Sequence, residues 1–504
     1  MTEQFPLAVQ RRRTELRLVL AAAFITGGAY VLAAFGKNSQ MPARIVPFAV
    51  ALIALLVVAH VAVRRLARGA DPALLPIAVL LNGLGYVMIA RLSDERAAAQ
   101  TTWTLIAVGA FVATLLLVPR VSDLLRFKWS FLAASVVLLL LPQVPGLGRS
   151  VGGARIWVGV GPISFQPGEF AKIALALFFA AYLSENRLDI RGGDRRVGPL
   201  MIPEPRYLLP ITAAWGFAVA VMVASKDLGS ALLFFTLFTV MLWIATERGF
   251  FLVLGTVLFA GAAVIAYQLF DVVRTRVSVW LDPWSQYEGT GYQASQAMFS
   301  FASGGTGGTG LGMGSPNKVP AASTDYIFAA IGEELGLLGA TAVLVAFLLL
   351  IGAGLRIALQ FDRDAVDASA QPATAGRAPL SAALHVDRDF SKLLATGLTT
   401  IIGMQAFIIT GGVLRLIPLT GITLPFVSYG GSSLLANYIL LALLIRLSDT
   451  VARQGDEVPD DLSLGERWQL LRERRIERSE SAARARRRQA VGSGTGSPGG
   501  GGQR

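Results

Sequence analysis

The sequence has no cysteine among its 504 residues. This absence excludes disulfides, cysteine-ligated metal sites and thiol nucleophiles. Charge is also scarce, because charged residues make up 15% of the chain whereas hydrophobic residues make up 54%. Such a composition is too apolar for an ordinary soluble globular protein. We therefore expect the lipid bilayer to be the main solvent, and any chemistry to come from carboxylates, hydroxyls, amines or the backbone.

Apolar runs of about 20 residues, each long enough to cross the hydrocarbon core of a bilayer, recur along the chain. They predict an all-α fold, a polytopic membrane helical bundle with about twelve spans. The predicted spans lie near residues 16–35, 44–63, 73–91, 101–119, 128–142, 164–184, 206–224, 228–246, 249–269, 325–354, 391–414 and 424–447.

The distribution of arginine predicts how these spans are oriented. If Arg11 to Arg13 face the cytoplasm, the loops that contain Arg64, Arg120 and Arg187 fall on the same side, as does the segment 363–392. An even number of spans returns the C-terminal tail to the cytoplasm. The loops predicted outside are 143–163, 270–324 and 415–423.

Much of the net charge of +12 lies in the arginine-rich tail. We expect this tail to be mostly disordered and attracted to anionic lipid headgroups. Nucleic acid is the weaker interpretation, because no folded basic domain accompanies the tail.

Carboxylates within apolar helices are costly unless they meet a partner or water. Asp325 stands where an apolar run begins, and Glu333 and Glu334 lie inside it. Two interpretations of Asp325 stay open at this point. It is either a helix-capping acid next to "ST", stabilised by the helix dipole, or a functional group at the end of a span.

Further charges support a polar cavity between the helices. Glu169 and Lys172 have the i,i+3 spacing that permits an ion pair on one helix face. Lys226 and Asp227 lie at a helix boundary, where snorkelling explains them as well as function does.

Six motifs, in order, resemble the SEDS family of RodA, FtsW and SpoVE proteins, and its RodA-like actinobacterial members in particular. They are GARIWVGVGPISFQPGEFAK (153–172), DLGSALL (227–233), DPWSQYEGTGYQASQA (282–297), GGTGGTGLGMG (304–314), STDYIFAAIGEELGLLG (323–339) and LPFVSYGGSS (424–433). The resemblance implies a peptidoglycan glycosyltransferase that polymerises lipid II on the outer face of the plasma membrane for cell elongation and shape, together with a class B penicillin-binding protein. A lipid II flippase and a division-specific FtsW-type synthase are the alternatives.

The family core has ten spans, so the resemblance implies that the first two predicted spans are an additional hairpin. The expected organisation is a basic N-terminus (1–15), the additional hairpin (16–63), a core (64–447) with an outer loop (270–324) and a cytoplasmic linker (363–390), and the tail (448–504).

The motifs place the family's essential extracellular acid on Asp325. The sequence departs from the family pattern at three positions: Ala321 and Ser323 stand where the family usually has glutamate and histidine, and Gly168 replaces a serine.

Transfer of the sugar from an α-linked pyrophosphate to give a β-1,4 bond requires inversion, with a base for the acceptor hydroxyl and cations for the leaving group. Asp325 is the candidate base.

Four cations are candidates for binding the pyrophosphate: Arg155, Lys172, Arg276 and Lys318. Other candidate substrate-binding residues in the motifs are Glu169, Gln293, Gln296 and Ser428. A divalent cation, Mg²⁺ or Mn²⁺, is expected as a substitute or helper for the basic side chains, with Asp325 as one potential ligand. No organic cofactor is expected.

Overall fold

The computed structural model describes residues 5–39, 45–151, 153–160, 163–192, 195–197, 200–202, 204–369 and 378–454. The helices in chain order are α1 (Phe5–Asn38), α2 (Ile45–Leu66), α3 (Leu74–Leu92), α4 (Asp94–Leu117), α5 (Lys128–Leu140), α6 (Gly168–Glu185), α7 (Arg187–Gly192), α8 (Pro205–Ala224), α9 (Leu228–Thr246), α10 (Phe250–Leu269), α11 (Asp271–Leu281), α12 (Tyr292–Gly304), α13 (Ile327–Ser369), α14 (Ala378–Val413) and α15 (Gly431–Gln454). Short 3-10 helices are η1 (Val121–Phe127), η2 (Leu141–Gln143) and η3 (Pro316–Lys318).

The predicted all-α membrane bundle is confirmed. Within the described residues, eleven helices are long and apolar enough to cross a membrane. The remaining predicted span, 164–184, corresponds to α6, which carries Glu169, Lys172 and Glu185 and is buried along nearly its whole length. Protein therefore surrounds α6 on most sides, which suits the charges that it carries.

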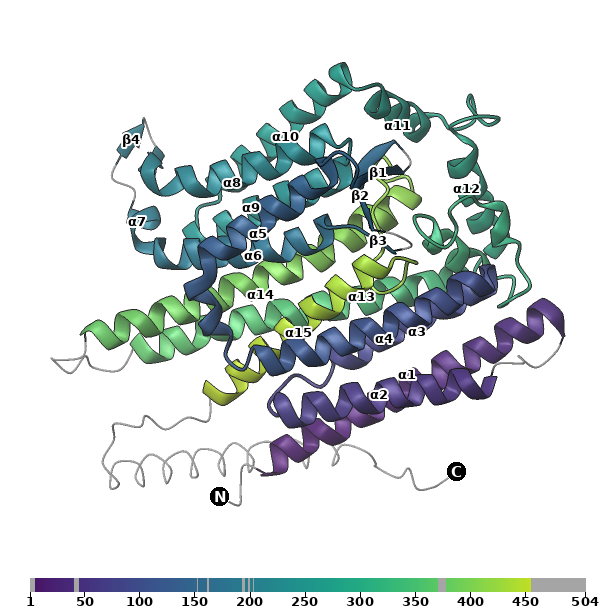
Figure 1. Cartoon of the computed structure of the whole chain (residues 1–504), viewed down its shortest axis with the longest axis horizontal. Helices are drawn as coiled ribbons and strands as arrows, with labels where there is room; N and C mark the ends of the chain where they lie inside the picture. Colours follow the sequence, from purple (N-terminus) through teal and green to yellow (C-terminus); the bar gives the residue numbers. More distant parts are fainter. Residues whose placement is uncertain are drawn as a thin grey trace, which may run out of the picture. The chain divides into compact units, whose positions relative to one another are not determined.

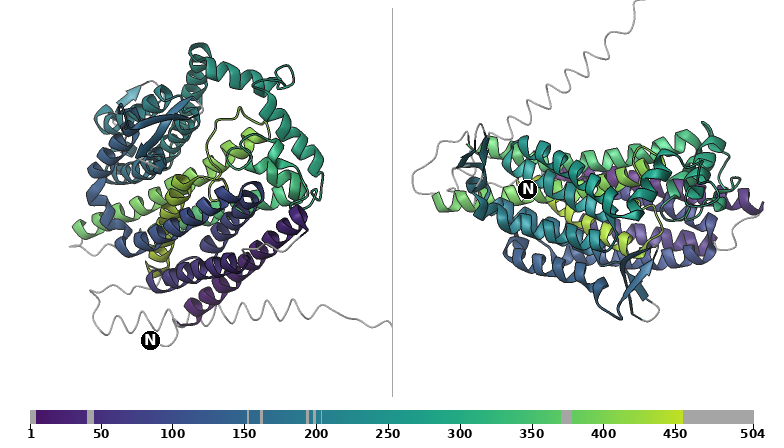
Figure 2. Two further views of the ribbon diagram at one scale, coloured as in Figure 1. Left: turned by 45° about the vertical axis from the view of Figure 1, so that its right-hand side comes forward. Right: turned by 90° about the horizontal axis from the view of Figure 1, so that it is seen from above.

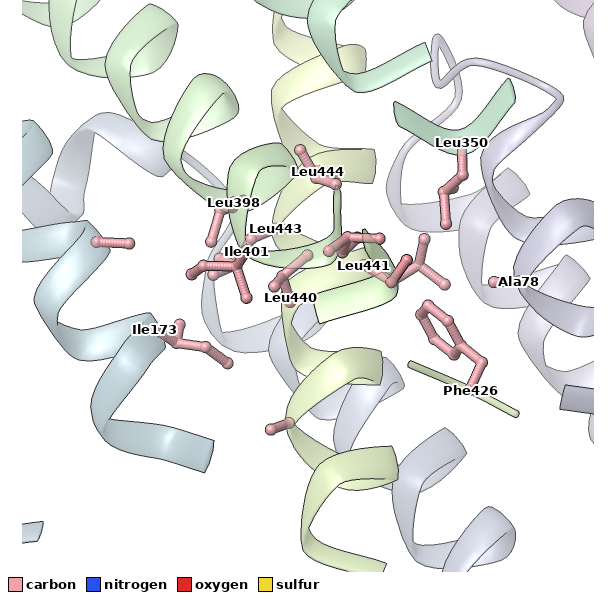
Figure 3. Close-up of a cluster of buried hydrophobic side chains, with 14 of the residues drawn as sticks. Ala78, Ile173, Leu350, Leu398, Ile401, Phe426, Leu440, Leu441, Leu443 and Leu444 are labelled. Atoms are coloured by element: carbon pink, nitrogen blue, oxygen red, sulfur yellow. The ribbon is translucent and has the colours of Figure 1, made fainter. Parts of the chain in front are cut away.

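The core of the bundle is centred on α15 (Figure 3). Leu440, Leu441 and Leu444 of α15 meet side chains from α3, α6, α13 and α14. Phe426, from the segment before α15, closes the same cluster. Helix α15 begins at Gly431, later than the predicted 424, because residues 424–430 form turns and carry Pro425, which lacks a backbone donor.

The connections between the helices gather at two ends of the bundle (Figure 1). One end carries α7 and β4, and the other carries α11 and α12 (Figures 1 and 2). Five short strands belong to these connections: β1 (Gly148–Val151), β2 (Ala154–Val160), β3 (Ile163–Phe165), β4 (Arg195–Val197) and β5 (Leu200–Ile202). The first three form an antiparallel sheet in the order β1-β2-β3, and the last two form a separate antiparallel pair.

Helix occupies much of two segments that the sequence predicts as loops. The outer loop 270–324 contains α11, α12 and η3. The linker 363–390 is entered by α13 from one side and by α14 from the other, with 370–377 outside the described residues. The tail is described only as far as Gln454, so its predicted disorder lies outside the described residues.

Candidate active site

Asp325 lies in a turn that immediately precedes α13. Residues 321–326 form this turn, in which the Tyr326 amide donates to the Ala321 carbonyl at 3.2 Å. Ala321 has a φ of 57°, a left-handed conformation that few non-glycine residues adopt. The half-buried Asp325 is therefore held in a fixed turn rather than in a regular helix.

A second segment, 424–430, is hydrogen-bonded to this turn. The Ser428 hydroxyl donates to the Thr324 carbonyl at 2.7 Å and accepts from the Leu424 amide at 3.0 Å. The Tyr429 amide donates to the Ser323 carbonyl at 2.8 Å. Ser428, expected from its motif to contact substrate, thus has its hydroxyl occupied in holding the Asp325 turn.

The side chains of Asp325 and Arg276 converge on Gly421. A Cβ atom added to Gly421 would lie 3.5 Å from Asp325 Oδ2 and 3.8 Å from Arg276 Nη2. Arg276, on α11, also donates from Nη1 to the Thr420 carbonyl at 3.0 Å. Gly421 has a φ of 80°, so glycine suits both the backbone conformation and the space beside the two side chains.

Electrostatics tune this pair toward acid–base chemistry. Burial raises the pKa of Asp325 to about 6, although the charge of Arg276 and a hydrogen bond from Thr324 oppose the rise. Burial lowers the pKa of Arg276, whereas the negative charges of Asp227 and Asp325 raise it. A carboxylate with a pKa near 6 is ionised at neutral pH yet is a better proton acceptor than an ordinary aspartate.

The capping interpretation of Asp325 finds little support. Helix α13 begins two residues later, and within the described residues no backbone amide of α13 donates to the Asp325 carboxylate. The charged partner that the carboxylate does face, Arg276, comes from another helix.

Helix α11 is fixed by reciprocal hydrogen bonds at its C-terminal end. Trp280 Nε1 donates to the Arg415 carbonyl at 2.9 Å, while Arg415 Nη2 donates to the Trp280 carbonyl at 2.6 Å. Arg415 has a φ of 60°, which indicates a specifically built turn after α14. These contacts and the Arg276–Thr420 bond attach α11 at two points to the segment 415–421.

A chain of buried charge extends from Arg276 into the bundle. Asp227 is 5% exposed and caps α9, accepting from the Ser230 amide at 3.0 Å. Burial raises the pKa of Asp227, and the negative charge of Glu169 raises it further. The hydrogen bonds from Ser230 and the positive charge of Arg276 act in the opposite direction. The sequence left Asp227 between snorkelling and function. Because its side chain is buried, it does not snorkel to water, and it lies close enough to Arg276 to feel that charge.

The predicted ion pair between Glu169 and Lys172 is present. Lys172 Nζ lies 2.5 Å from Glu169 Oε2 and 2.9 Å from Gln405 Oε1. Lys172 is 1% exposed and Glu169 6% exposed. Gln405, on α14, is a partner that spacing along the sequence could not reveal.

The glycine-rich segment 304–314 docks on a break in α13. Gly336 has φ 65° and ψ −166°, which interrupts the helix. The amides of Leu337 and Leu338 then donate to the carbonyls of Gly305 and Thr306, at 2.9 and 3.2 Å. In the opposite direction, the amides of Thr309 and Gly310 donate to the carbonyls of Glu333 and Glu334, at 2.9 and 3.0 Å. The segment satisfies backbone groups that the break would leave unpaired in a membrane.

Glu333 and Glu334 hold this segment with their carboxylates as well. Glu334 accepts from the Gly312 amide at 2.9 Å, and Glu333 accepts from the Ser315 amide at 2.6 Å. Arg91 Nε lies 3.0 Å from Glu334 Oε1, and Arg91 Nη2 donates to the Gly314 carbonyl at 2.9 Å. The two buried glutamates are therefore structural, and the loop amides that they bind are not free to contact phosphate.

Other predicted substrate-binding residues lie apart from the Asp325–Arg276 pair. Arg155, on β2, directs Nη2 toward the Val144 carbonyl at 3.4 Å. Gln296 donates to the Tyr287 hydroxyl at 3.2 Å. Lys318 and Gln293 are exposed in the outer loop. Within the described residues, no hydrogen bond or ion pair joins any of these four residues to Asp325.

Within the described residues, no group of three His, Asp or Glu side chains could hold a metal ion. Asp325 is nevertheless a suitable single ligand for a hard cation. Mg²⁺ commonly binds through one or two carboxylates and takes its remaining ligands from substrate phosphates and water. A divalent cation at Asp325 would therefore take most of its ligands from substrate phosphates and water.

Residues 72–368 and 378–453 match the FtsW/RodA/SpoVE family, described as cell cycle proteins. The chain belongs to this family. The match begins after α2, so α1 and α2 lie outside it. The resemblance carried by the six motifs is thereby confirmed.

Individual relatives are similar over most of the chain. The chain is 42% identical to the peptidoglycan glycosyltransferase RodA of Mycobacterium tuberculosis over 466 residues, which are 89% of this chain and 94% of that protein. It is 41% identical to the RodA of Mycobacterium leprae over 87% of this chain and 90% of that one. A probable peptidoglycan glycosyltransferase FtsW of M. tuberculosis is 34% identical over 74% of this chain and 66% of its own length.

Two solved structures share the fold. One belongs to a study of the coordination of polymerization and crosslinking by a peptidoglycan synthase complex; it has a TM-score of 0.57 and 25% identity, covering 76% of this chain and 98% of the other. The second is the crystal structure of the rod shape determining protein RodA of Thermus thermophilus. Its TM-score is 0.50 at 24% identity, and the match covers 75% of this chain and 96% of the Thermus thermophilus chain.

Proposed function

We infer that this chain is a peptidoglycan glycosyltransferase that polymerises lipid II, with a RodA-like role in cell elongation and shape. Its family membership and its 42% identity to RodA support the enzyme class. The observation that carries the mechanism is the convergence of Asp325 and Arg276 on Gly421. A carboxylate and a guanidinium that meet at one point would serve as the proton acceptor and the cation that inverting transfer to a hydroxyl requires, which supports the proposal.

In this mechanism the acceptor sugar's 4-hydroxyl gives its proton to Asp325 as its oxygen attacks the anomeric carbon of the donor. The bond from that carbon to the pyrophosphate oxygen breaks on the opposite face, and the lipid pyrophosphate leaves with the electron pair. Arg276 stabilises the negative charge that develops on the leaving group. Asp325 then returns its proton to water.

Other charged groups have supporting roles in the proposal. Glu169, Lys172 and Asp227 maintain a polar interior beside Arg276, while the exposed Lys318 and Gln293 and the strand residue Arg155 would contact more distant parts of the substrate. A Mg²⁺ or Mn²⁺ ion held by Asp325 and the donor's pyrophosphate would neutralise charge on the leaving group.

We place the end of the bundle that carries Asp325, hereafter the Asp325 end, outside the plasma membrane, with both chain termini in the cytoplasm. The arginine-rich loops at the opposite end support this orientation through the positive-inside rule. No ATP is available outside the cell, so the reaction must use a donor that arrives activated. A lipid-linked sugar pyrophosphate meets that need.

The position of Asp325 also bears on the transporter alternative. A flippase needs its key charges near the middle of the membrane, whereas Asp325 precedes the candidate span Ile327–Phe361. A class B penicillin-binding protein is the proposed partner, since the structural neighbour was studied as part of a peptidoglycan synthase complex. Greater similarity to RodA than to FtsW favours elongation over division.

The decisive experiment combines the purified chain, its cognate penicillin-binding protein and labelled lipid II, with glycan strands resolved on a gel. Wild type should form strands and Asp325→Asn should form none, although it folds and binds the partner. Asp271→Asn is the matched control, because Asp271 is an exposed carboxylate on α11 whose one ion pair within the described residues is with Arg274. Near-normal strand formation by Asp325→Asn would show that Asp325 is not the base.

A further inference from the structure

A cavity of about 730 Å³ lies among α1, α2, α3 and α4, far along the chain from Asp325. Most of its wall is apolar, with Leu52, Leu55 and Leu56 on one side and Val79, Val87 and Val108 on the other. Lys37, Asp94 and Ala98 of its lining are exposed, so the cavity opens to the surroundings of the bundle. Because α1 and α2 precede the family match, 11 of the 25 lining residues lie outside the matched region.

The charged part of the lining lies at the Asp325 end of the bundle. Lys37 is in the last turn of α1, Arg91 is in the last turn of α3, and Asp94 is in the first turn of α4. Arg91 is engaged by Glu334 and Gly314. Lys37 forms no ion pair within the part of the chain that the structure describes, so one cation and the carboxylate of Asp94 remain at the opening.

Below the charges, three aromatic rings stack across the cavity. The ring centroids of Tyr30 and Phe48 are 4.2 Å apart, and those of Phe48 and Tyr86 are 5.1 Å apart. Tyrosine is typical of the depth at which lipid headgroups meet hydrocarbon. From the opening inward, charge gives way to aromatic rings and then to a mainly aliphatic wall that also carries Thr26 and Asn82.

The depth of the cavity also corresponds to one leaflet. Thr26 lines its inner part, and the helical rise from Lys37 back to Thr26 is about 16 Å. This is close to half of the roughly 30 Å hydrocarbon thickness. A cavity that reaches from one surface to the middle of the membrane suits a lipid that belongs to a single leaflet.

We propose that this cavity is a binding site for a zwitterionic glycerophospholipid of the leaflet at the Asp325 end. The acyl chain occupies the aliphatic part, the phosphate lies at Lys37, and the headgroup amine lies at Asp94. Water is the rival occupant, since Thr26 Oγ1 and Asn82 Oδ1 are buried without hydrogen-bond partners. The largely apolar wall and the opening favour the lipid.

The bound lipid would contact the wall that supports the glycine-rich segment. Arg91 lines the cavity and binds Glu334 and Gly314. Ala33 lines it too, and a Cβ atom added to Gly312 would lie 2.2 Å from the Ala33 carbonyl oxygen. The lipid therefore braces α1 against the segment 304–314.

The test measures binding directly and is independent of glycosyl transfer. The full chain is purified, delipidated and mixed with phosphatidylethanolamine, and retained lipid is counted by native mass spectrometry. Wild type should retain one molecule. Ala51→Trp, which places an indole in the cavity, should retain none. Ala54→Trp is the matched control, because Ala54 is exposed on the same helix and does not line the cavity.

Lys37→Gln tests the headgroup assignment at an exposed position where folding is not at risk. It should weaken retention at least tenfold, while Lys37→Arg should not. Equal retention by Ala51→Trp and Ala54→Trp would overturn the proposal, as would a folded wild type that retains no lipid, the result expected of a water-filled cavity. Equal retention of phosphatidylglycerol would overturn the zwitterionic assignment. If Ala51→Trp does not fold, the comparison of Lys37→Gln with Lys37→Arg decides whether the lipid binds here, and equal retention by these two variants would overturn the proposal.

Discussion

The Ser428 hydroxyl donates a hydrogen bond to the carbonyl of Thr324, at 2.7 Å, directly before Asp325. Ser428 is 4% exposed, and the same hydroxyl accepts from the Leu424 amide. It thus joins two segments that are distant in sequence and fixes the backbone that carries the candidate base. Removing it leaves two backbone groups without their partner.

Ser428→Ala should therefore slow polymerisation through misplacement of Asp325. An unsatisfied buried polar group costs about 1–3 kcal/mol, so we expect kcat to fall about tenfold or more while the chain still accumulates in the membrane. The measurement is the initial rate of strand formation with lipid II. Ser303→Ala is the control, because the exposed Ser303 hydroxyl donates to the Phe299 carbonyl of its own helix, α12. An unchanged kcat for Ser428→Ala would remove the positioning role.

The pH dependence of the rate should report the ionisation of Asp325. Its pKa is raised to about 6 by burial, and the base must be deprotonated to accept a proton. Activity should therefore rise with pH, reach half of its maximum near pH 6, and level off above about pH 7. A rate that stays constant between about pH 5 and pH 8 would contradict the assignment.

Arg276→Gln tests the Asp325–Arg276 pair through the direction in which the pH profile moves. The positive charge of Arg276 lowers the pKa of Asp325, so its loss should move the midpoint of the pH profile upward as well as lowering the maximal rate. Arg274→Gln, on the same helix, removes an exposed charge that pairs with Asp271 and should leave the midpoint in place. A downward shift for Arg276→Gln would show that the two side chains do not interact as described.

Residue type and spacing predict the residues of the candidate site but not their pairings. The motifs predict Asp325 as the base, and hydropathy placed it at the end of a span, which the candidate span Ile327–Phe361 confirms. Arg276 was one of four candidate cations, and only the tertiary contact with the segment 415–421 distinguishes it from the other three. Ser428 was expected to bind substrate, yet its hydroxyl is used by the backbone. Contacts between segments far apart in sequence depend on how the helices pack, which periodicity does not encode.

The partners of Glu333 and Glu334 are likewise contacts that the sequence pattern did not predict. Both were recognised as carboxylates that must have partners inside an apolar helix. Their partners are backbone amides of the glycine-rich segment, together with Arg91. Glycine favours a break of this kind, but Gly332 and Gly339 lie nearby, and the sequence does not show that Gly336 is the one that leaves the helical conformation.

The ion pair of Glu169 and Lys172 should respond to mutation as a unit. Removing one partner of a buried pair leaves an uncompensated charge and costs about 3–5 kcal/mol. Lys172→Met should be the more damaging single change. Within the described residues it removes the one ion-pair partner of Glu169, whereas Lys172 keeps its hydrogen bond to Gln405 when Glu169 is replaced.

The double variant Glu169→Leu/Lys172→Met should be more stable than Lys172→Met alone, as measured by thermal unfolding in detergent. Asp271 and Arg274 form an exposed pair with the same i,i+3 spacing, and their double substitution should change stability little. Additive losses at Glu169 and Lys172 would argue against coupling.

The docked glycine-rich segment can be tested with two adjacent glycines. Gly308 has a φ of 84°, and a Cβ atom there would lie 2.2 Å from the Glu334 carbonyl oxygen, whereas one at Gly307 would meet nothing within 4 Å. Gly308→Val should therefore detach the segment from α13, expose it to protease and lower polymerisation at least tenfold, or about 1.4 kcal/mol. Gly307→Val should remain close to wild type in both measurements. Equal activity of the two variants, with the segment cleaved only in Gly308→Val, would show that docking of the segment is not required for glycosyl transfer.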